Sequence, residues 1–115
     1  MKRLLYIFLL SLITSIAYAD RLSHPLDFKG TEKEKNYVVS YIKGYVKEIY
    51  SKIGMGDPST LRKIENEEWN SFEQLTKVNN RKLLDDVIKE YCKIPGMCTY
   101  GAFLIMYDEK NKASK

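Results

Sequence analysis

Few side chains of this sequence are of the types that carry out nucleophilic or general acid–base chemistry. The single histidine, His24, stands three residues before Asp27 in a segment that has no helical periodicity. A nucleophilic site needs a base and a nucleophile held rigidly beside oxyanion donors, and such a segment offers no support of that kind. We therefore interpret His24 as a solvated residue or a helix-packing contact and not as a catalytic base.

Carboxylates are the remaining candidates for acid–base or metal chemistry. Glu65 and Glu68 are three residues apart and could share one face of a helix, as a paired-carboxylate site or a metal site requires. The basic residues just before them favour ordinary surface ion pairs instead. No glycine-rich phosphate loop, metalloprotease helix motif or calcium-loop pattern occurs in the sequence. We therefore predict a protein that is not an enzyme and that holds no cofactor or metal.

Residues 1–19 have the organisation of a secretory signal peptide. An apolar stretch from Leu4 to Ile16 follows a basic start, and Ala17 and Ala19 are the small residues that signal peptidase accepts. The stretch is shorter than the roughly 20 residues that a membrane-spanning helix needs, although an uncleaved anchor is the alternative. We predict cleavage after Ala19 and a periplasmic or secreted mature protein without stable membrane insertion.

Removal of the signal peptide lowers the net charge of the chain. The whole chain has 19 basic and 15 acidic residues, which gives a net charge of +4. Lys2 and Arg3 leave with the signal peptide, so the mature chain keeps a net charge of +2. So small a positive excess does not favour binding to nucleic acid, which an exported protein seldom meets. We expect another exported protein, and no nucleic acid, as the partner.

The two cysteines, Cys92 and Cys98, are an even number in a chain that carries an export signal. We expect them to pair in an oxidising compartment, and the Pro-Gly pair between them is typical of a turn. Zinc would need more ligands than two cysteines and a distant histidine supply. A thioredoxin-type redox pair has about two intervening residues, far fewer than here. We predict a structural disulfide at the corner between two elements.

Hydrophobic periodicity predicts an all-α protein, a small bundle of about four helices with the last two joined by the disulfide. An extended lead-in at 20–30 precedes a helical domain at 31–109 and a frayed tail at 110–115. The expected helices cover 32–53, 58–75, 83–91 and the segment from 100 onward, with starts marked by the capping residues Thr31, Asp57 and Thr99. The polar stretch at 65–70 could divide the second helix in two.

Three tyrosines recur every four residues on the first predicted helix. Tyr37, Tyr41 and Tyr45 therefore line one flank of that helix. Tyrosine suits both the margin of a core and a protein-binding surface, because its large apolar ring ends in a polar group. Packing at the core margin is the first interpretation, since so small a domain needs its large side chains. If the aliphatic face points to the core centre, the tyrosine flank is the candidate partner-binding surface.

Two stretches, Ile53 to Leu61 and Cys92 to Lys115, resemble small exported accessory proteins of bacterial conjugative-transfer and type IV secretion clusters. This resemblance carries over no catalytic motif and implies another exported protein as the partner. The chain also resembles periplasmic acid-stress chaperones in size, signal peptide, helical content and its two cysteines. In that family, however, the cysteines join segments that are distant in the sequence.

The first functional hypothesis is an exported helical protein-interaction module, an accessory of conjugation or type IV secretion. The second is an immunity or inhibitor protein against a toxin or hydrolase. The third is an acid-stress chaperone, because protonation of its many carboxylates could unfold the chain. The sequence leaves the oligomeric state and the identity of the partner open.

Overall fold

The described residues form helices joined by short turns, as the hydrophobic periodicity predicts. A computed structural model describes residues 22–114, and the predicted signal peptide at 1–19 lies outside this range. No strand occurs between residues 22 and 114, so the all-α prediction is confirmed. The described elements in chain order are a 3-10 turn, η1 (Pro25–Asp27), and four α-helices, α2 (Glu32–Ser51), α3 (Pro58–Leu75), α4 (Arg81–Tyr91) and α5 (Tyr100–Ala113). None of these described helices is long and apolar enough to cross a membrane.

Each α-helix between residues 22 and 114 begins after a residue whose side chain accepts a hydrogen bond from a free backbone N–H. Thr31 does so for α2, within the predicted capping box, and Asp57 does so for α3. Asn80 and Thr99 have the same role at the starts of α4 and α5. Short polar side chains are preferred at these positions because the first turn of a helix has N–H groups without intrahelical partners. The predicted starts at Thr31, Asp57 and Thr99 are therefore confirmed.

Two helix ends differ from the prediction. α2 stops at Ser51, before the predicted end at Ile53, and Gly54 has a φ of +76° in the turn that follows. A residue with positive φ just beyond a helix end reverses the chain, and glycine adopts this conformation without strain. α5 continues through the predicted tail from 110, where Lys110 forms an ion pair of 3.1 Å with Glu90 of α4. The tail is therefore helical almost to its end.

The lead-in contains a turn where the sequence predicts extended chain. His24 Nδ1 accepts a hydrogen bond of 3.1 Å from the backbone N–H of Leu26 and thereby caps η1. Pro25 starts this turn, a position where a missing N–H costs nothing, and its side chain is buried. η1 packs against α3. The hydroxyl of Tyr100 on α5 donates to the carbonyl of Ser23 at 2.9 Å, so the lead-in is attached to the bundle.

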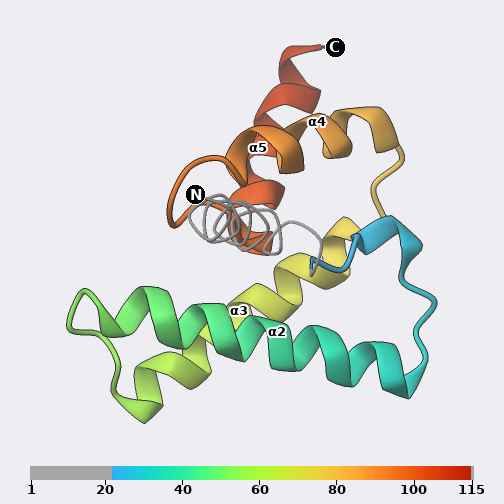
Figure 1. Cartoon of the computed structure of the whole chain (residues 1–115). Coiled ribbons are helices and arrows are strands. Elements are labelled where there is room, and N and C mark those ends of the chain that lie inside the picture. Colours follow the sequence, from blue (N-terminus) through green and yellow to red (C-terminus); the bar gives the residue numbers. More distant parts are fainter. Residues whose placement is uncertain (1–21, 115) are drawn as a thin grey trace, which may run out of the picture.

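The helices pack as two consecutive pairs that meet along α3 and α5. α2 packs against α3, α4 packs against α5, and α3 packs against α5 (Figure 1). The rings of Phe72 on α3 and Tyr100 on α5 meet edge to face at the centre, with centroids 4.8 Å apart. The buried core consists of Val38, Ile42, Tyr45, Val46, Phe72, Leu75, Leu84, Val87, Tyr100, Phe103 and Tyr107. α3 remains one helix through its polar stretch, because Phe72 and Leu75 anchor it in this core.

The predicted disulfide is confirmed. Cys92 and Cys98 are bonded in the loop between α4 and α5, with their Cα atoms 4.2 Å apart. The chain-entropy relation gives a stabilisation of about 2 kcal/mol for so short a closed loop. We call residues 92–98 the disulfide loop. Because disulfides persist in oxidising compartments, this bond fits a protein of such a compartment.

Candidate functional site

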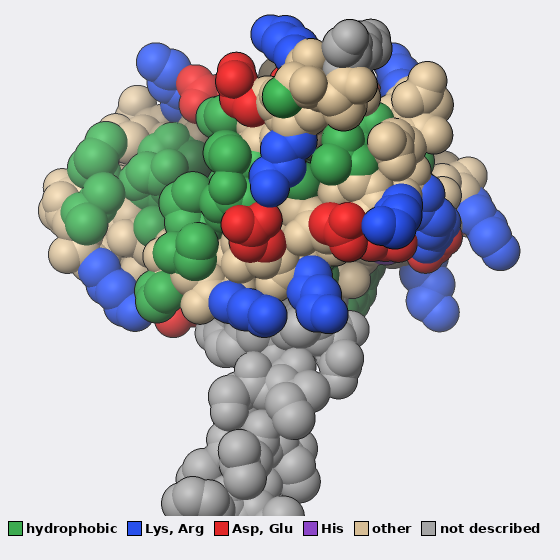
Figure 2. Space-filling view, turned by 90° about the horizontal axis from the view of Figure 1, so that it is seen from above, with side chains coloured by type: hydrophobic (Ala, Val, Ile, Leu, Met, Phe, Trp, Pro, Cys, Tyr) green, Lys and Arg blue, Asp and Glu red, His purple; other side chains and the backbone are tan. Residues whose placement is uncertain are grey.

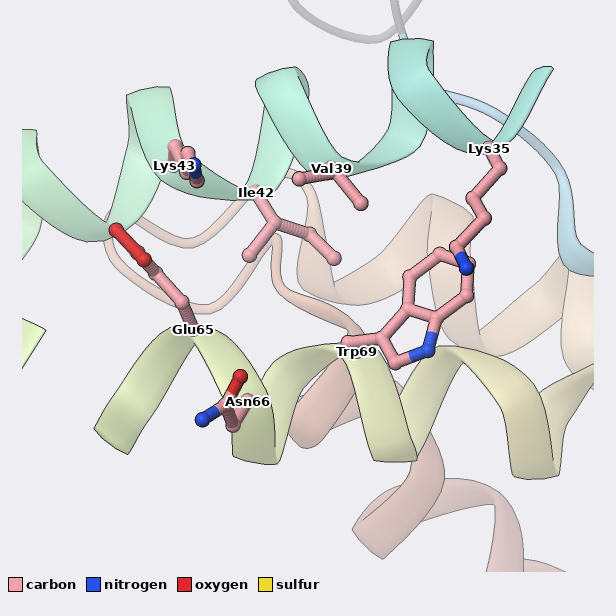
Figure 3. Close-up of a pocket in the computed structure, with 7 residues that line it drawn as sticks. All are labelled: Lys35, Val39, Ile42, Lys43, Glu65, Asn66 and Trp69. Atoms are coloured by element: carbon pink, nitrogen blue, oxygen red, sulfur yellow. The ribbon is translucent and has the colours of Figure 1, made fainter. Parts of the chain in front are cut away.

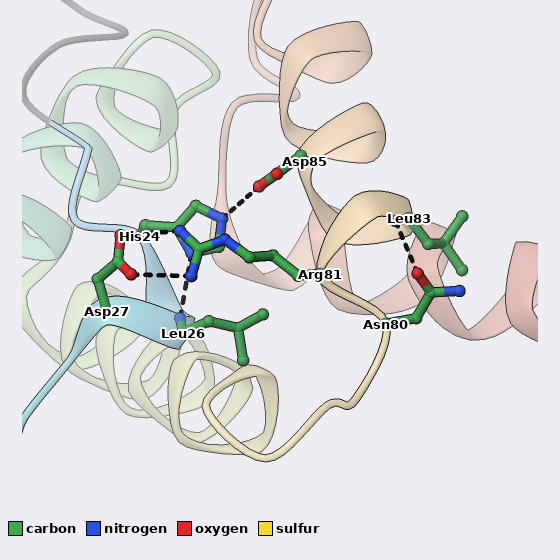
Figure 4. Close-up of polar contacts among 7 residues, drawn as sticks. All are labelled: His24, Leu26, Asp27, Asn80, Arg81, Leu83 and Asp85. Carbon is green, nitrogen blue, oxygen red and sulfur yellow. Dashed lines mark hydrogen bonds and ion pairs between the residues drawn. The ribbon is translucent and has the colours of Figure 1, made fainter.

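His24 and Asp27 do not form a catalytic pair, because each binds a different residue of α4. His24 Nε2 lies 2.6 Å from Asp85 Oδ1, whereas Asp27 accepts two hydrogen bonds, of 2.9 and 3.0 Å, from Arg81 (Figure 4). Since Nδ1 of His24 accepts from Leu26, the neutral ring carries its proton on Nε2 and donates to Asp85. His24 is therefore a helix-packing contact, one of the two interpretations that the sequence allows.

The Asp27–Arg81 pair has a positional role. The hydrogen bonds from Arg81 hold the pKa of Asp27 below its ordinary value, and the same contact raises the pKa of Arg81. Both side chains are more than half exposed, and exposed ion pairs contribute little to stability. The paired geometry of the guanidinium and the carboxylate instead fixes η1 beside the first turn of α4.

Glu65 and Glu68 do not form a paired-carboxylate site. Glu65 lines a pocket between α2 and α3, whereas Glu68 reaches across to the start of α5. Between residues 22 and 114, no group of three or more histidine, cysteine, aspartate or glutamate side chains is arranged to hold a metal ion. The two carboxylates therefore have separate surroundings and separate roles.

Glu68 lies in a hydrogen-bond network that links three helices. Its Oε1 accepts from the hydroxyl of Tyr45 on α2 at 2.5 Å. The backbone N–H of Gly101 on α5 donates to both carboxylate oxygens, at 3.2 Å to Oε1 and 3.1 Å to Oε2. Free N–H groups and the helix dipole stabilise negative charge in the first turn of a helix. Burial of Tyr45, together with the Glu68 charge beside it, raises the pKa of the Tyr45 hydroxyl.

An open pocket lies beside this network, where the disulfide loop meets the end of α2. Its volume is about 300 Å³, and Tyr50, Met97, Ile105 and Met106 form most of its apolar wall. Among the described residues, Glu68 is the only charged one that lines it. We call this cavity the Glu68 pocket. It combines an apolar wall with a single carboxylate.

A second pocket, of about 260 Å³, lies between α2 and α3. Figure 3 shows Lys35 and Trp69 at one end of it, with Glu65 pointing toward α2. The ammonium group of Lys35 lies 5.7 Å from the centroid of the Trp69 ring. The same ring stacks on Phe72, with centroids 5.5 Å apart. Trp69 is thus packed by side chains of its own chain.

The tyrosine flank of α2 is only partly exposed. Tyr37 is 49% exposed, Tyr41 is half-buried and Tyr45 is 9% exposed. The ring of Tyr41 packs edge to face against Tyr45 and Tyr100, with centroids 5.4 and 6.5 Å apart. The flank is therefore a core margin at Tyr45 and a surface at Tyr37.

Sequence reasoning did not single out the apolar residues of the Glu68 pocket. The sequence did contain one signal for the exposure of Ile105 on α5. Phe103 and Tyr107 lie on the core face of this helix and are buried. Ile105 is two residues from each of them, so helical geometry places it on the opposite side. An isoleucine there has no core to enter, and it is 63% exposed.

Comparisons with known proteins do not assign this chain to a family. No family model matches the chain, and neither a curated protein nor a solved structure matches it. The resemblance to accessory proteins of conjugation and type IV secretion therefore stays a prediction. Functional inference rests on the geometry of the chain's own residues.

Proposed function

We propose that this protein is an exported helical protein-interaction module and that it binds its partner at the end of the molecule around the Glu68 pocket. The observation that supports the proposal is the exposure of large apolar side chains at this end. Ile105 on α5 is 63% exposed and Ile94 in the disulfide loop is 44% exposed. In the turn after α2, Ile53 is 62% exposed and Met55 is 43% exposed.

These exposed side chains belong to segments that meet at one pocket. Ile105 lines the pocket directly. The N–H of Met55 donates to the carbonyl of Tyr50, and the N–H of Met97 donates to the carbonyl of Ile94. Both Tyr50 and Met97 line the pocket. Figure 2 shows hydrophobic side chains gathered at the left of the face seen from above, the end where Figure 1 places the α2–α3 turn and the disulfide loop.

Two properties of this end favour protein binding. Gathered apolar side chains on a protein surface mark interaction sites, since they gain free energy when a partner removes them from water. Three of the side chains involved, Met55, Met97 and Met106, are methionines, which adapt their shape to a partner's surface. The disulfide restricts the loop that carries Met97, so less conformational freedom is lost on binding.

The proposal is tested by placing a photo-crosslinking amino acid at Ile105 in cells that naturally export the protein. The matched control position is Lys82, whose side chain is 90% exposed and which lies in the first turn of α4, away from the disulfide loop. We expect a discrete adduct with another exported protein from position 105 and not from position 82. No adduct at position 105, or the same adducts at both positions, contradicts the proposal.

Identification of the adduct separates the classes of partner. A component of a conjugation or type IV secretion apparatus supports the accessory role that the sequence resemblance implies. A toxin or a hydrolase supports the immunity or inhibitor role instead. Both results keep the interaction module and differ only in its biological setting.

A further inference from the structure

We infer that the Glu68 pocket receives a lysine or arginine side chain of the partner. This inference rests on the proposed function and adds to it the chemistry of the anchoring side chain. The pocket has an apolar wall and one carboxylate. Lysine and arginine have the matching parts, an apolar stem that packs along hydrophobic surface and a positive tip.

The carboxylate of Glu68 has no cationic partner among the described residues. The ion pairs of this part of the chain involve other carboxylates. The donors to Glu68 are neutral groups, the hydroxyl of Tyr45 and the backbone N–H of Gly101. Oε1 accepts hydrogen bonds from both donors. Oε2 accepts one hydrogen bond, from the Gly101 N–H, which also donates to Oε1. A carboxylate oxygen accepts about two hydrogen bonds, so Oε2 can accept another from a cation in the pocket.

The apolar wall suits the stem of the same side chain. Met97, Ile105 and Met106 offer methyl and methylene groups along the pocket, and Tyr50 adds an aromatic ring. An aromatic ring also attracts a cation that lies over its face. The volume of about 300 Å³ is enough for one long side chain and not for a folded segment.

Other side chains fit the pocket less well. An acidic side chain is repelled by the Glu68 charge, since like charges at close range are unfavourable. A purely apolar side chain would cover the carboxylate without offering it a donor, which costs free energy. A basic side chain matches both the apolar wall and the negative charge. The partner's contact segment should therefore present a lysine or arginine among apolar residues.

The test uses three small probes of equal chain length, pentylammonium, pentan-1-ol and pentanoate, each titrated into the purified exported protein. Binding is followed by NMR through the methyl signals of Met97, Met106 and Ile105. We expect pentylammonium to shift these signals saturably and to bind about tenfold more tightly than pentan-1-ol, with pentanoate weakest. Equal affinity of pentylammonium and pentan-1-ol, or no saturable shift with pentylammonium, overturns the inference. This comparison needs no variant.

Two matched variants test whether the charge of Glu68 causes the preference for pentylammonium. Glu68→Gln removes the charge and keeps an amide oxygen that can accept from Tyr45 and Gly101, so the network retains its donors. We expect this variant to bind pentylammonium and pentan-1-ol equally. Glu65→Gln makes the same charge change three residues away, in the other pocket, and should keep the tenfold preference. Loss of the preference in both variants contradicts a specific role of Glu68.

The two proposals fail in distinguishable ways. A position-specific adduct at Ile105 together with no preference for pentylammonium supports the interaction module. The same result contradicts the binding of a lysine or arginine side chain in the Glu68 pocket. A preference for pentylammonium together with no adduct supports cation binding in the Glu68 pocket. The same result contradicts partner binding at this end of the molecule.

Discussion

The carboxylate of Glu68 occupies the space that a side chain at Gly101 would need. A Cβ placed on Gly101 would overlap Oε2 of Glu68, and the N–H of Gly101 donates to both oxygens of that carboxylate. Glycine at this position leaves room for the carboxylate in the first turn of α5. The absence of a side chain lets α3 attach to the start of α5 through a charged hydrogen-bond acceptor.

We expect Gly101→Ala to destabilise the protein by about 1 kcal/mol. The added methyl group displaces the Glu68 carboxylate, and the hydrogen bonds to a charged acceptor are lost. This loss exceeds the smaller gain in helix propensity from alanine. Chemical denaturation with urea measures the free energy of unfolding. An unchanged or increased value contradicts the packing of Glu68 against Gly101.

Gly44→Ala should have the opposite effect. Gly44 lies inside α2, and a Cβ placed there meets no atom within 4 Å. Alanine in an unobstructed helix interior is more favourable than glycine by about 1 kcal/mol. We expect the free energy of unfolding to rise by that amount in the same urea experiment. Since both variants make the same chemical change, a fall in stability at Gly44 would show that α2 is packed more tightly there than the structure indicates.

The protein should lose stability in alkali because of two buried tyrosines. Burial raises the pKa of Tyr45 and of Tyr100 above their ordinary values. An unfolded chain releases its tyrosine protons from about pH 10 upward, whereas the folded protein keeps them. The stabilisation is therefore complete below about pH 10 and is lost as the pH rises further, by up to about 1.4 kcal/mol per pH unit for each tyrosine. Urea denaturation from about pH 8 to about pH 11 measures this slope.

Tyr45→Phe isolates one of these two groups. The variant has no hydroxyl at position 45 to titrate, so its stability should fall less steeply with pH than that of the unmodified protein. It should also be less stable at neutral pH by about 1.5 kcal/mol, because the hydrogen bond to Glu68 is lost. An unchanged alkaline slope would show that Tyr45 ionises as easily in the folded protein as in the unfolded chain.

The tyrosine flank predicts two different outcomes for the same substitution. Tyr41 contacts the rings of Tyr45 and Tyr100, so Tyr41→Ala should cost about 2 kcal/mol of stability. Tyr37 is 49% exposed, and Tyr37→Ala should change stability by less than about 0.5 kcal/mol. Thermal melts separate the two. If Tyr37→Ala also abolishes the crosslink from Ile105, the partner surface extends onto this flank.

The helix starts could be predicted from the sequence because capping is a local interaction. Thr31 and Glu34 are three residues apart, and Asp57 is adjacent to Pro58, so each signal lies within one helical turn. The disulfide was predictable for a similar reason. Cys92 and Cys98 are the only cysteines, and a turn joins them.

The candidate site could not be predicted because its contacts are long-range. Glu68 and Gly101 are 33 residues apart, and their contact depends on how α3 crosses α5. His24 shows the same limit. Its partner Asp85 is 61 residues away, while the nearby Asp27 binds Arg81 instead. Residue types alone do not show which of several carboxylates a given donor binds. The packing of the helices determines this choice.

The Cys92–Cys98 bond also determines what a protease can do to this protein. Lys93 and the residues up to Gly96 are exposed between the two cysteines, and exposed loops are preferred cleavage sites. A cut after Lys93 breaks the backbone, yet the two fragments stay covalently joined through sulfur. The nicked molecule then runs as one species without reductant and as two with it. α4 and α5 thus remain covalently connected after scission.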